Sequence, residues 1–351
     1  MTSPLLVGKL PPELLEALLE RAPTQDPQVL VGPGIGLDCA VLGTGGPNLL
    51  VLKSDPITFA TEEIGWYAVQ VNTNDIATTG ATPRWLLSTL LLPEGRTDAG
   101  LVERISAGLY AACREAGITV IGGHTEITYG LERPILVGTL VGEVPRERLV
   151  TPRGARPGDR LLLTKGVPVE ATAILANEFP DRLRQEGQLS QAELDRAQAF
   201  LHDPGIGVLT EARLATEVGE VHAMHDPTEG GLYAALWELA EACGHPLWVE
   251  PAAVPVPELS RRICQALGLD PLGAIASGAL LLAVAPDDVE AIQEALSEAG
   301  IHCAEIGRVL EEPPAPSKTE IRGPGAWRPS PDGPTPLPRP ARDEIVRLFE
   351  N

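Results

Sequence analysis

Residues 74–83 read Asn-Asp-Ile-Ala-Thr-Thr-Gly-Ala-Thr-Pro, and this stretch joins a predicted helix to a predicted strand. Residues 62–80 have the small and apolar pattern of a helix that ends near Gly80, and the apolar run at 86–92 predicts a buried strand. Asp75 falls within that helix. A carboxylate among small helical residues is expensive to bury unless it is paired or bound to metal. The pattern therefore favours a functional Asp75, with an exposed helical aspartate as the alternative.

Strand and helix patterns alternate on both sides of this stretch. In the first half, strands are predicted at 29–31, 40–42, 48–52, 119–121 and 135–144, and helices at 14–19 and 98–116. In the second half, strands are predicted at 160–164, 278–284 and 304–309, and helices at 168–179, 190–201, 206–217, 230–243, 257–267 and 287–299. The alternation predicts two α/β or α+β domains.

Two connecting segments set the predicted boundaries. A Pro/Arg/Gly-rich connection at 144–159 separates the halves, so we expect domains at 1–148 and 149–312. Residues 311–341 are rich in proline, which indicates an extended surface segment, and 342–349 have a short helical pattern. We therefore expect a separate tail at 313–351.

The composition excludes several classes of protein. The chain has 351 residues, a formal net charge of -21, and only 4% aromatic residues, so its core must consist of Leu, Val, Ile and Ala. No Lys/Arg block interrupts the acidity, which argues against a nucleic-acid partner. No apolar stretch reaches the length of a membrane span and no secretory leader is visible, so we expect a cytoplasmic protein without a membrane partner.

The cysteines predict neither a zinc site nor a disulfide framework, because they are odd in number and include no C-x-x-C pair. They are Cys39, Cys113, Cys243, Cys264 and Cys303. The common catalytic fingerprints are also absent, among them G-x-x-x-x-G-K-[ST], G-x-G-x-x-G, G-x-S-x-G and H-E-x-x-H. P-loop NTPases, dinucleotide-dependent oxidoreductases, serine hydrolases and zincins are therefore not expected.

Two more carboxylates stand in short motifs near the start of the chain. Asp38 ends a glycine-rich segment that includes Gly34 and Gly36, which indicates either a phosphate-approaching loop with a metal ligand or an ordinary loop before a strand. Asp55, in Lys53-Ser54-Asp55-Pro56, follows the strand predicted at 48–52. It is either a site residue at the carboxyl end of that strand or part of an Asx-type turn.

A third motif is Gly122-Gly123-His124-Thr125-Glu126, which follows the strand predicted at 119–121. Paired glycines after a strand expose backbone donors. His124 has the chemistry to bind metal, contact phosphate or carry a proton, and a structural hydrogen-bonding role is the alternative.

The second half contributes Asp226-Pro227-Thr228-Glu229-Gly230-Gly231, just before a predicted helix. Asp226 or Thr228 suits the N-cap position, and free N–H groups at a helix start favour an anion. The two glycines indicate close approach of a ligand or of another backbone. Lys165, at the end of the strand at 160–164, either neutralises a phosphate or lies in a surface turn.

Taken in this order, the motifs resemble the superfamily of aminoimidazole ribonucleotide (AIR) synthase, the hydrogenase maturation protein HypE, selenophosphate synthetase and thiamine-monophosphate kinase, over about residues 30–310. Within it, the chain looks most like HypE and HypE-like AIR synthase-related proteins. Asn74-Asp75 with Gly80-Ala81-Thr82-Pro83, and Asp226 to Leu232, carry the likeness. The resemblance implies a two-domain AIR-synthase-like fold, whose N-terminal domain forms a shared β-barrel in a homodimer beside a C-terminal α/β domain.

The resemblance also implies a chemistry, in which ATP and Mg²⁺ serve to phosphorylate an oxygen of an unknown small-molecule or protein acceptor. Carried over, the metal ligands are Asp38, Asp55 and Asp75, with Glu126 as the substitute for the acidic residue that His124 replaces in the family's Gly-Gly-Asp. The nucleotide-binding candidates are Gly34, Gly36, Asn74, Gly122, Gly123, Thr228, Gly230 and Gly231. The catalytic candidates are His124, Lys165 and Asp226.

One departure separates the sequence from HypE proper, which ends in a cysteine that carries a carbamoyl group. This sequence ends Leu348-Phe349-Glu350-Asn351, so dehydration of a C-terminal thiocarbamate is not expected of it. The resemblance thus predicts an ATP- and Mg²⁺-dependent enzyme that activates an amide- or carbamoyl-type oxygen. Two alternatives stay open: a non-catalytic nucleotide-binding maturation scaffold, and a small-molecule kinase similar to thiamine-monophosphate kinase.

Overall fold

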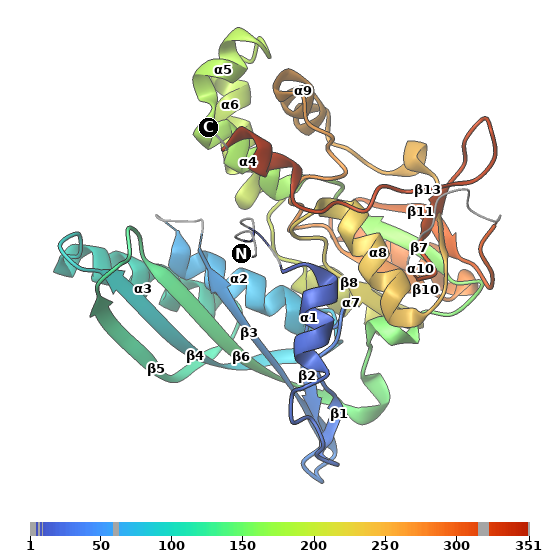
Figure 1. The fold of residues 1–351 in the computed structure, drawn as a ribbon, viewed down its shortest axis with the longest axis horizontal. Coiled ribbons are helices and arrows are strands. Elements are labelled where there is room, and N and C mark those ends of the chain that lie inside the picture. Colours follow the sequence, from blue (N-terminus) through green and yellow to red (C-terminus); the bar gives the residue numbers. More distant parts are fainter. Residues whose placement is uncertain (1–4, 6–7, 9, 59–62, 315–322, 350–351) are drawn as a thin grey trace. The chain divides into compact units, whose positions relative to one another are not determined.

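The computed structural model describes residues 5, 8, 10–58, 63–314 and 323–349, and these form two compact units. The first unit comprises the described residues of Thr24–Pro33 and Asp38–Leu149; the second comprises those of Met1–Pro23, Gly34–Leu37 and Val150–Asn351. Both units mix helices and strands (Figure 1), which confirms the α+β fold class.

The first unit is built on a six-stranded sheet in the order β1-β2-β3-β6-β4-β5. All neighbours are antiparallel except β4 and β5, which run parallel. Its elements are β1 (Val29–Val31), β2 (Ala40–Leu42), β3 (Asn48–Ile57), α2 (Ile64–Ala77), β4 (Thr82–Pro93), α3 (Ala99–Glu115), β5 (Thr119–Thr128), β6 (Ile135–Pro145) and η1 (Arg146–Arg148).

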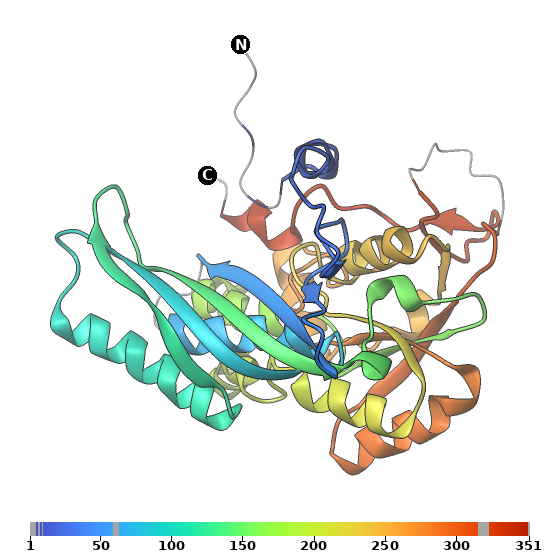
Figure 2. The same ribbon diagram turned by 90° about the horizontal axis from the view of Figure 1, so that it is seen from below.

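Helices α2 and α3 lie side by side on one face of this sheet (Figure 2). The helix α2 is buried along most of its length, as its small residues predict. Gly65 allows it to lie close to α3, because a Cβ there would stand 2.3 Å from the carbonyl oxygen of Ile105. Asp98 is the N-cap of α3, and its side chain accepts a hydrogen bond from the backbone N–H of Leu101 at 2.7 Å.

Two strands of this unit are longer than the sequence predicted. The strand β3 continues through Lys53, Ser54 and Asp55 to Ile57, so Asp55 lies within a strand and not after it. The strand β5 likewise continues through Gly122 and Gly123 to Thr128. The strand predicted at 119–121 therefore ended too early: the pairing with β4 persists, with a register irregularity beside Leu86 and Leu87.

The second unit has a seven-stranded sheet in the order β13-β12-β9-β11-β7-β10-β8. Its strands are β7 (Arg160–Thr164), β8 (Val221–His225), β9 (Leu247–Val249), β10 (Leu281–Val284), β11 (Cys303–Val309), β12 (Ala326–Arg328) and β13 (Thr335–Pro336). Its α-helices are α1 (Pro12–Leu19), α4 (Val169–Glu178), α5 (Pro180–Gln185), α6 (Gln191–Gln198), α7 (Leu209–Val218), α8 (Gly231–Cys243), α9 (Glu258–Leu267) and α10 (Val289–Glu298). Short 3₁₀ helices are η2 (Pro152–Gly154), η3 (Ala199–Leu201), η4 (Pro251–Ala253), η5 (Pro286–Asp288) and η6 (Glu344–Leu348).

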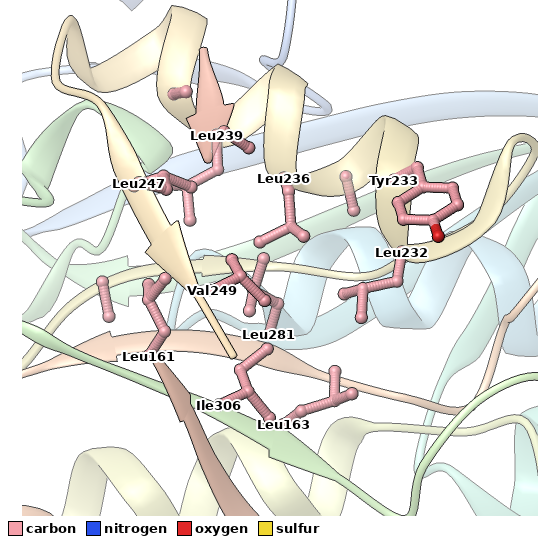
Figure 3. Close-up of a cluster of buried hydrophobic side chains, with 14 of the residues drawn as sticks. Leu161, Leu163, Leu232, Tyr233, Leu236, Leu239, Leu247, Val249, Leu281 and Ile306 are labelled. Atoms are coloured by element: carbon pink, nitrogen blue, oxygen red, sulfur yellow. The ribbon is translucent and has the colours of Figure 1, made fainter. Parts of the chain in front are cut away.

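The main core of this unit lies between α8 and the sheet (Figure 3). Leu232, Leu236 and Leu239 of α8 meet Leu161 of β7 and Leu281 of β10. The strands β7 and β10 are buried on both faces, which explains their continuous apolar sequences. A second apolar cluster joins α4, α5, α6 and α9 to η6 through Ile345.

The proline-rich tail is not the surface segment that its composition indicated. Its residues 323–349 add β12 and β13 to the sheet, and Trp327 is almost fully buried. Asp343 and Ile345 of the same segment are also buried. The segment 315–322 of this tail lies outside the described residues. Among the residues that the structure describes, no helix combines the length and apolarity of a membrane span.

Candidate functional site

Two of the carboxylates singled out in the sequence meet around one ammonium group in the first unit. Lys53 Nζ lies 3.4 Å from Asp55 Oδ2 and 3.3 Å from Asp75 Oδ2. The side chains of Lys53 and Asp75 are only 14% and 6% exposed, whereas that of Asp55 is 35% exposed. The cluster thus lies deep enough for its charges to interact strongly, and it opens to solvent at Asp55.

Side chains along β3 point alternately to opposite faces of the sheet, which explains how these charged groups come together. Leu49, Val51 and Ile57 are buried, and Lys53 and Asp55 share their parity in the strand and so project to the same side. Helix α2 packs against β3 and supplies Asp75. The face that is apolar at the start of the strand therefore becomes charged where Asp75 lies.

An asparagine of α2 ties the helix to the strand beside this cluster. The backbone N–H of Asp55 donates to Asn72 Oδ1 at 3.2 Å, and Asn72 Nδ2 donates to the carbonyl of Ala68. Gly138 pairs with Asp55 across β6, and a Cβ at Gly138 would stand 2.5 Å from Asn72 Nδ2. Asn74, a predicted nucleotide ligand, is fully buried in the same helix.

Electrostatics hold Lys53 in its charged form. Burial lowers the pKa of Lys53, but the negative charges of Asp75, Asp55 and Asp38 together outweigh burial and raise that pKa well above its usual range. Asp38 is thus close enough to contribute to the same cluster. The backbone beside it is also anchored, because Cys39 Sγ donates to the carbonyl oxygen of Asp75 at 3.2 Å.

The donor set suits a hard cation. Asp38, Asp55 and Asp75 offer carboxylate oxygens, which Mg²⁺ prefers, and an ammonium group already occupies a cation position between two of them. The residues present therefore fit the divalent ion that the sequence led us to expect.

His124 and Glu126 lie apart from this cluster. Both are exposed on β5, with His124 Nε2 3.3 Å from Glu126 Oε2. Their neighbour Gly123 is linked to Asp55 by cross-strand pairs: Gly123 on β5 pairs with Ser88 on β4, which pairs with Gly138 on β6, which pairs with Asp55 on β3. These pairs span three strand spacings, roughly 14 Å along the sheet. Within the first unit, Glu126 does not join the carboxylates around Lys53.

Several predicted phosphate-binding glycines have a packing role in the structure. A Cβ at Gly123 would stand 2.0 Å from the carbonyl oxygen of Ser88, and one at Gly36 would stand 2.5 Å from that of Glu238 on α8. Gly34 is less constrained, since its nearest neighbour is the flexible side chain of Leu37. Gly122 faces only the side chain of Leu87, at 3.7 Å.

The motif at 226–231 forms the entry to α8 in the second unit. Asp226 is buried, and Thr228 is half-buried and accepts the N–H of Gly231 through its carbonyl. Gly230 and Gly231 both have positive φ, and a Cβ at Gly231 would stand 2.6 Å from the carbonyls of Leu272 and Ala274. The close approach that the glycines indicated is therefore, at Gly231, an approach to another backbone.

Lys165 is not placed to meet a phosphate, nor is it a surface residue. Its Nζ lies 2.6 Å from Glu211 Oε1 and donates to the carbonyls of Gly205 and Gly207. Both side chains are almost fully buried. Three internal acceptors thus hold the ammonium group of Lys165, and its catalytic role stays a prediction that these contacts do not support.

Sequence reasoning missed Lys53 and two acidic groups of the second unit. A basic residue two positions before Asp55 in a strand shares its face, and that spacing was the available signal for Lys53. Glu170 and Asp343 are buried acids in the second unit, and burial raises the pKa of each. The charge of Asp343 contributes to the raised pKa of Glu170. The two residues lie far apart in the sequence, so no local pattern marks them as neighbours.

Comparison with known proteins places this chain in a family. The family model for the AIR synthase related protein, N-terminal domain, matches residues 36–144, and that for the C-terminal domain matches residues 156–315. The chain belongs to the AIR synthase-related family, in its HypE-like branch.

Similar curated proteins are carbamoyl dehydratases HypE. That of Cupriavidus necator is 32% identical over 286 residues, 79% of this chain and 78% of the relative. That of Azotobacter vinelandii is 34% identical over 275 residues, 76% of each chain.

Solved structures show the same fold. A HypE in complex with ATP has a TM-score of 0.67 and 29% identity, covering 88% of this chain and 90% of that one. A thiamine monophosphate kinase from Aquifex aeolicus has a TM-score of 0.65 at 21% identity, covering 90% and 94%, which shows the shared fold alone.

Proposed function

We propose that this chain is an ATP- and Mg²⁺-dependent enzyme that activates an amide- or carbamoyl-type oxygen by phosphoryl transfer. The observation that carries the proposal is the pair Asp55 and Asp75, held around a buried cation position in a HypE-like fold. Similarity to carbamoyl dehydratases and to a HypE bound to ATP supports the reaction class.

The residues of the first unit have defined tasks in this proposal. Asp38, Asp55 and Asp75 would hold the metal, with Asp55 at the solvent-open side. When bound, Mg²⁺ neutralises charge on the phosphate oxygens during the transfer. The hydrogen bonds of Asn72 fix the position of α2 against β3, so that the distance between the carboxylates of Asp55 and Asp75 is maintained.

The transfer itself is a substitution at the γ-phosphorus. The acceptor's oxygen forms a bond to phosphorus while the bond from phosphorus to the bridging oxygen of ADP breaks, so that ADP leaves. The carbon that carried the oxygen becomes electrophilic. Inorganic phosphate is lost when the activated C–O bond breaks, while the amide nitrogen gives up its two protons and forms a further bond to that carbon, so that the acceptor is dehydrated. The protein contributes chiefly positioning and electrostatic stabilisation in such reactions.

We further propose that the working protein is a homodimer paired through β5. The strand β5 ends the sheet, and its side chains Ile121 and Ile127 are 55% and 60% exposed, followed by Tyr129 at 85%. A long apolar edge strand is a template for pairing with another chain. In such a dimer, His124 and Glu126 would lie at the interface between the two copies, and the predicted roles of these residues would belong to a site at that interface.

Calorimetric titration with ATP, with and without Mg²⁺, tests the enzyme proposal. We expect metal-dependent binding by the wild-type protein, loss of it in Asp75→Asn and Asp55→Asn, and no loss in Glu115→Gln, an exposed carboxylate of α3. Absence of binding under all conditions would overturn the proposal. Mass spectrometry of products then separates a stable phosphorylated product, as from a kinase, from a dehydrated one.

A further inference from the structure

The sequence predicted no role for Lys53, but the structure places it at the centre of the carboxylate cluster. Its ammonium group lies between the carboxylates of Asp55 and Asp75, at 3.4 and 3.3 Å, and its side chain is mostly buried. Both contacts use the Oδ2 atom of the respective carboxylate. The same two carboxylates are ligands of the divalent ion in the site proposed above.

The charges of the cluster show what Lys53 does in the protein without nucleotide. Three carboxylates, Asp38, Asp55 and Asp75, carry three negative charges, and Lys53 reduces the total to two. Without that ammonium group, Asp55 and Asp75 would lose the one cation that both of them are shown to contact among the described residues. Like charges at that depth repel strongly, and an uncompensated buried carboxylate is unfavourable.

We propose that Lys53 is a resident cation that positions Asp55 and Asp75 and competes with divalent metal for their oxygens. This inference rests on the metal site of the proposed function and deepens it. It makes Lys53 a positioning residue that sets how tightly the protein alone binds a divalent ion. Nucleotide-free protein should then bind metal weakly, and the bound form requires that the ammonium group move off at least one Oδ2 atom.

Divalent metal binding without nucleotide provides the test, with Mn²⁺ as the probe. Free Mn²⁺ is followed by its electron paramagnetic resonance signal during titration of wild type, Lys53→Met and Lys53→Arg. We expect Lys53→Met to bind Mn²⁺ at least about tenfold more tightly than wild type. Lys53→Arg keeps the positive charge and should remain close to wild type. Equal affinities in all three proteins would overturn the proposal.

Thermal unfolding gives a second readout that does not depend on activity. Lys53→Met should unfold at a lower temperature than wild type in metal-free buffer, and Mn²⁺ should restore it to a larger extent than it stabilises wild type. A purely structural role in packing predicts a loss that Mn²⁺ does not repair, and that result would contradict the proposal.

A double variant keeps the proposal testable if Lys53→Met fails to fold. In Lys53→Met with Asp75→Asn, the buried negative charge is removed together with its counterion, so the metal-free protein should be more stable than Lys53→Met alone. A double variant as unstable as the single one would show that Lys53 acts through its packing. Because no nucleotide is present, these outcomes remain separate from the result of the ATP titration.

Discussion

The carboxylate of Asp343 accepts a hydrogen bond from the backbone N–H of Gly230, with 2.6 Å between Oδ2 and the nitrogen. Asp343 is buried, and its other oxygen accepts the N–H of Ile345 at 3.1 Å. The start of α8 thus holds an anion, as its sequence predicted, but the chain itself supplies that anion. Gly230 therefore offers its N–H to a phosphate only when Asp343 has left.

Removal of this carboxylate should destabilise the second unit. Asp343→Ala leaves the N–H groups of Gly230 and Ile345 without their side-chain acceptor, and a lost cap or buried hydrogen bond costs about 1–3 kcal/mol. Urea denaturation measures the change, with Asp332→Ala, an exposed aspartate, as the control. Equal stability of both variants would show that water replaces Asp343 without cost.

Glu170 should make stability depend on pH. Burial raises the pKa of Glu170 from an ordinary 4.5 to about 7, while hydrogen bonds from Ser277 act in the opposite direction and the charges of Asp343 and Glu229 add to the increase. The folded protein then holds this proton more tightly than the unfolded chain. Its contribution is therefore fully present below pH 4.5 and is lost as the pH rises through about 7.

Comparison of wild type with Glu170→Gln isolates that contribution. The change in the pKa of Glu170 corresponds to about 3 kcal/mol. As the pH rises from acidic to alkaline, the free energy of unfolding of Glu170→Gln should therefore increase relative to that of wild type by up to that amount. Urea denaturation at a series of pH values gives the difference in the free energy of unfolding. A difference that stays constant over the series would contradict the assignment.

The ion pair between Lys165 and Glu211 should behave as a buried pair. Lys165→Met leaves the Glu211 carboxylate buried without its counterion and should reduce the free energy of unfolding by about 3–5 kcal/mol. The double variant Lys165→Met with Glu211→Met should recover much of that loss, because no charge remains buried. If chemical denaturation shows the single variant to be as stable as wild type, solvent must reach this pair.

A charge on the edge strand should block dimer formation. Ile127→Lys places an ammonium group on the exposed side of β5, and we expect light scattering after size exclusion to change from dimer to monomer. Tyr110→Lys, which alters an exposed aromatic residue on α3, should leave the dimer intact. A wild-type protein that is monomeric at every concentration would overturn the proposed interface.

Local patterns predicted most helices well and some strands poorly. The sequence placed α2, α3 and α9 within about three residues of their observed ends, since periodicity and end signals lie within the helix itself. It ended β5 too early because Gly122 and Gly123 are typical of turns. In the structure, pairing with β4 overrides the turn preference of these glycines. In the tail, the prolines indicated an exposed segment, but packing buries Trp327.

The amino-acid sequence by itself determined the two-part α+β organisation and singled out Asp55 and Asp75 as candidate site residues, because short motifs and hydrophobic periodicity are local properties. The tertiary structure alone decided which charges meet. Lys53 contacts Asp75 only because α2 packs on β3, and Lys165 meets Glu211 only because α7 lies beside the end of β7. Such contacts depend on chain packing over many residues, which no local pattern encodes.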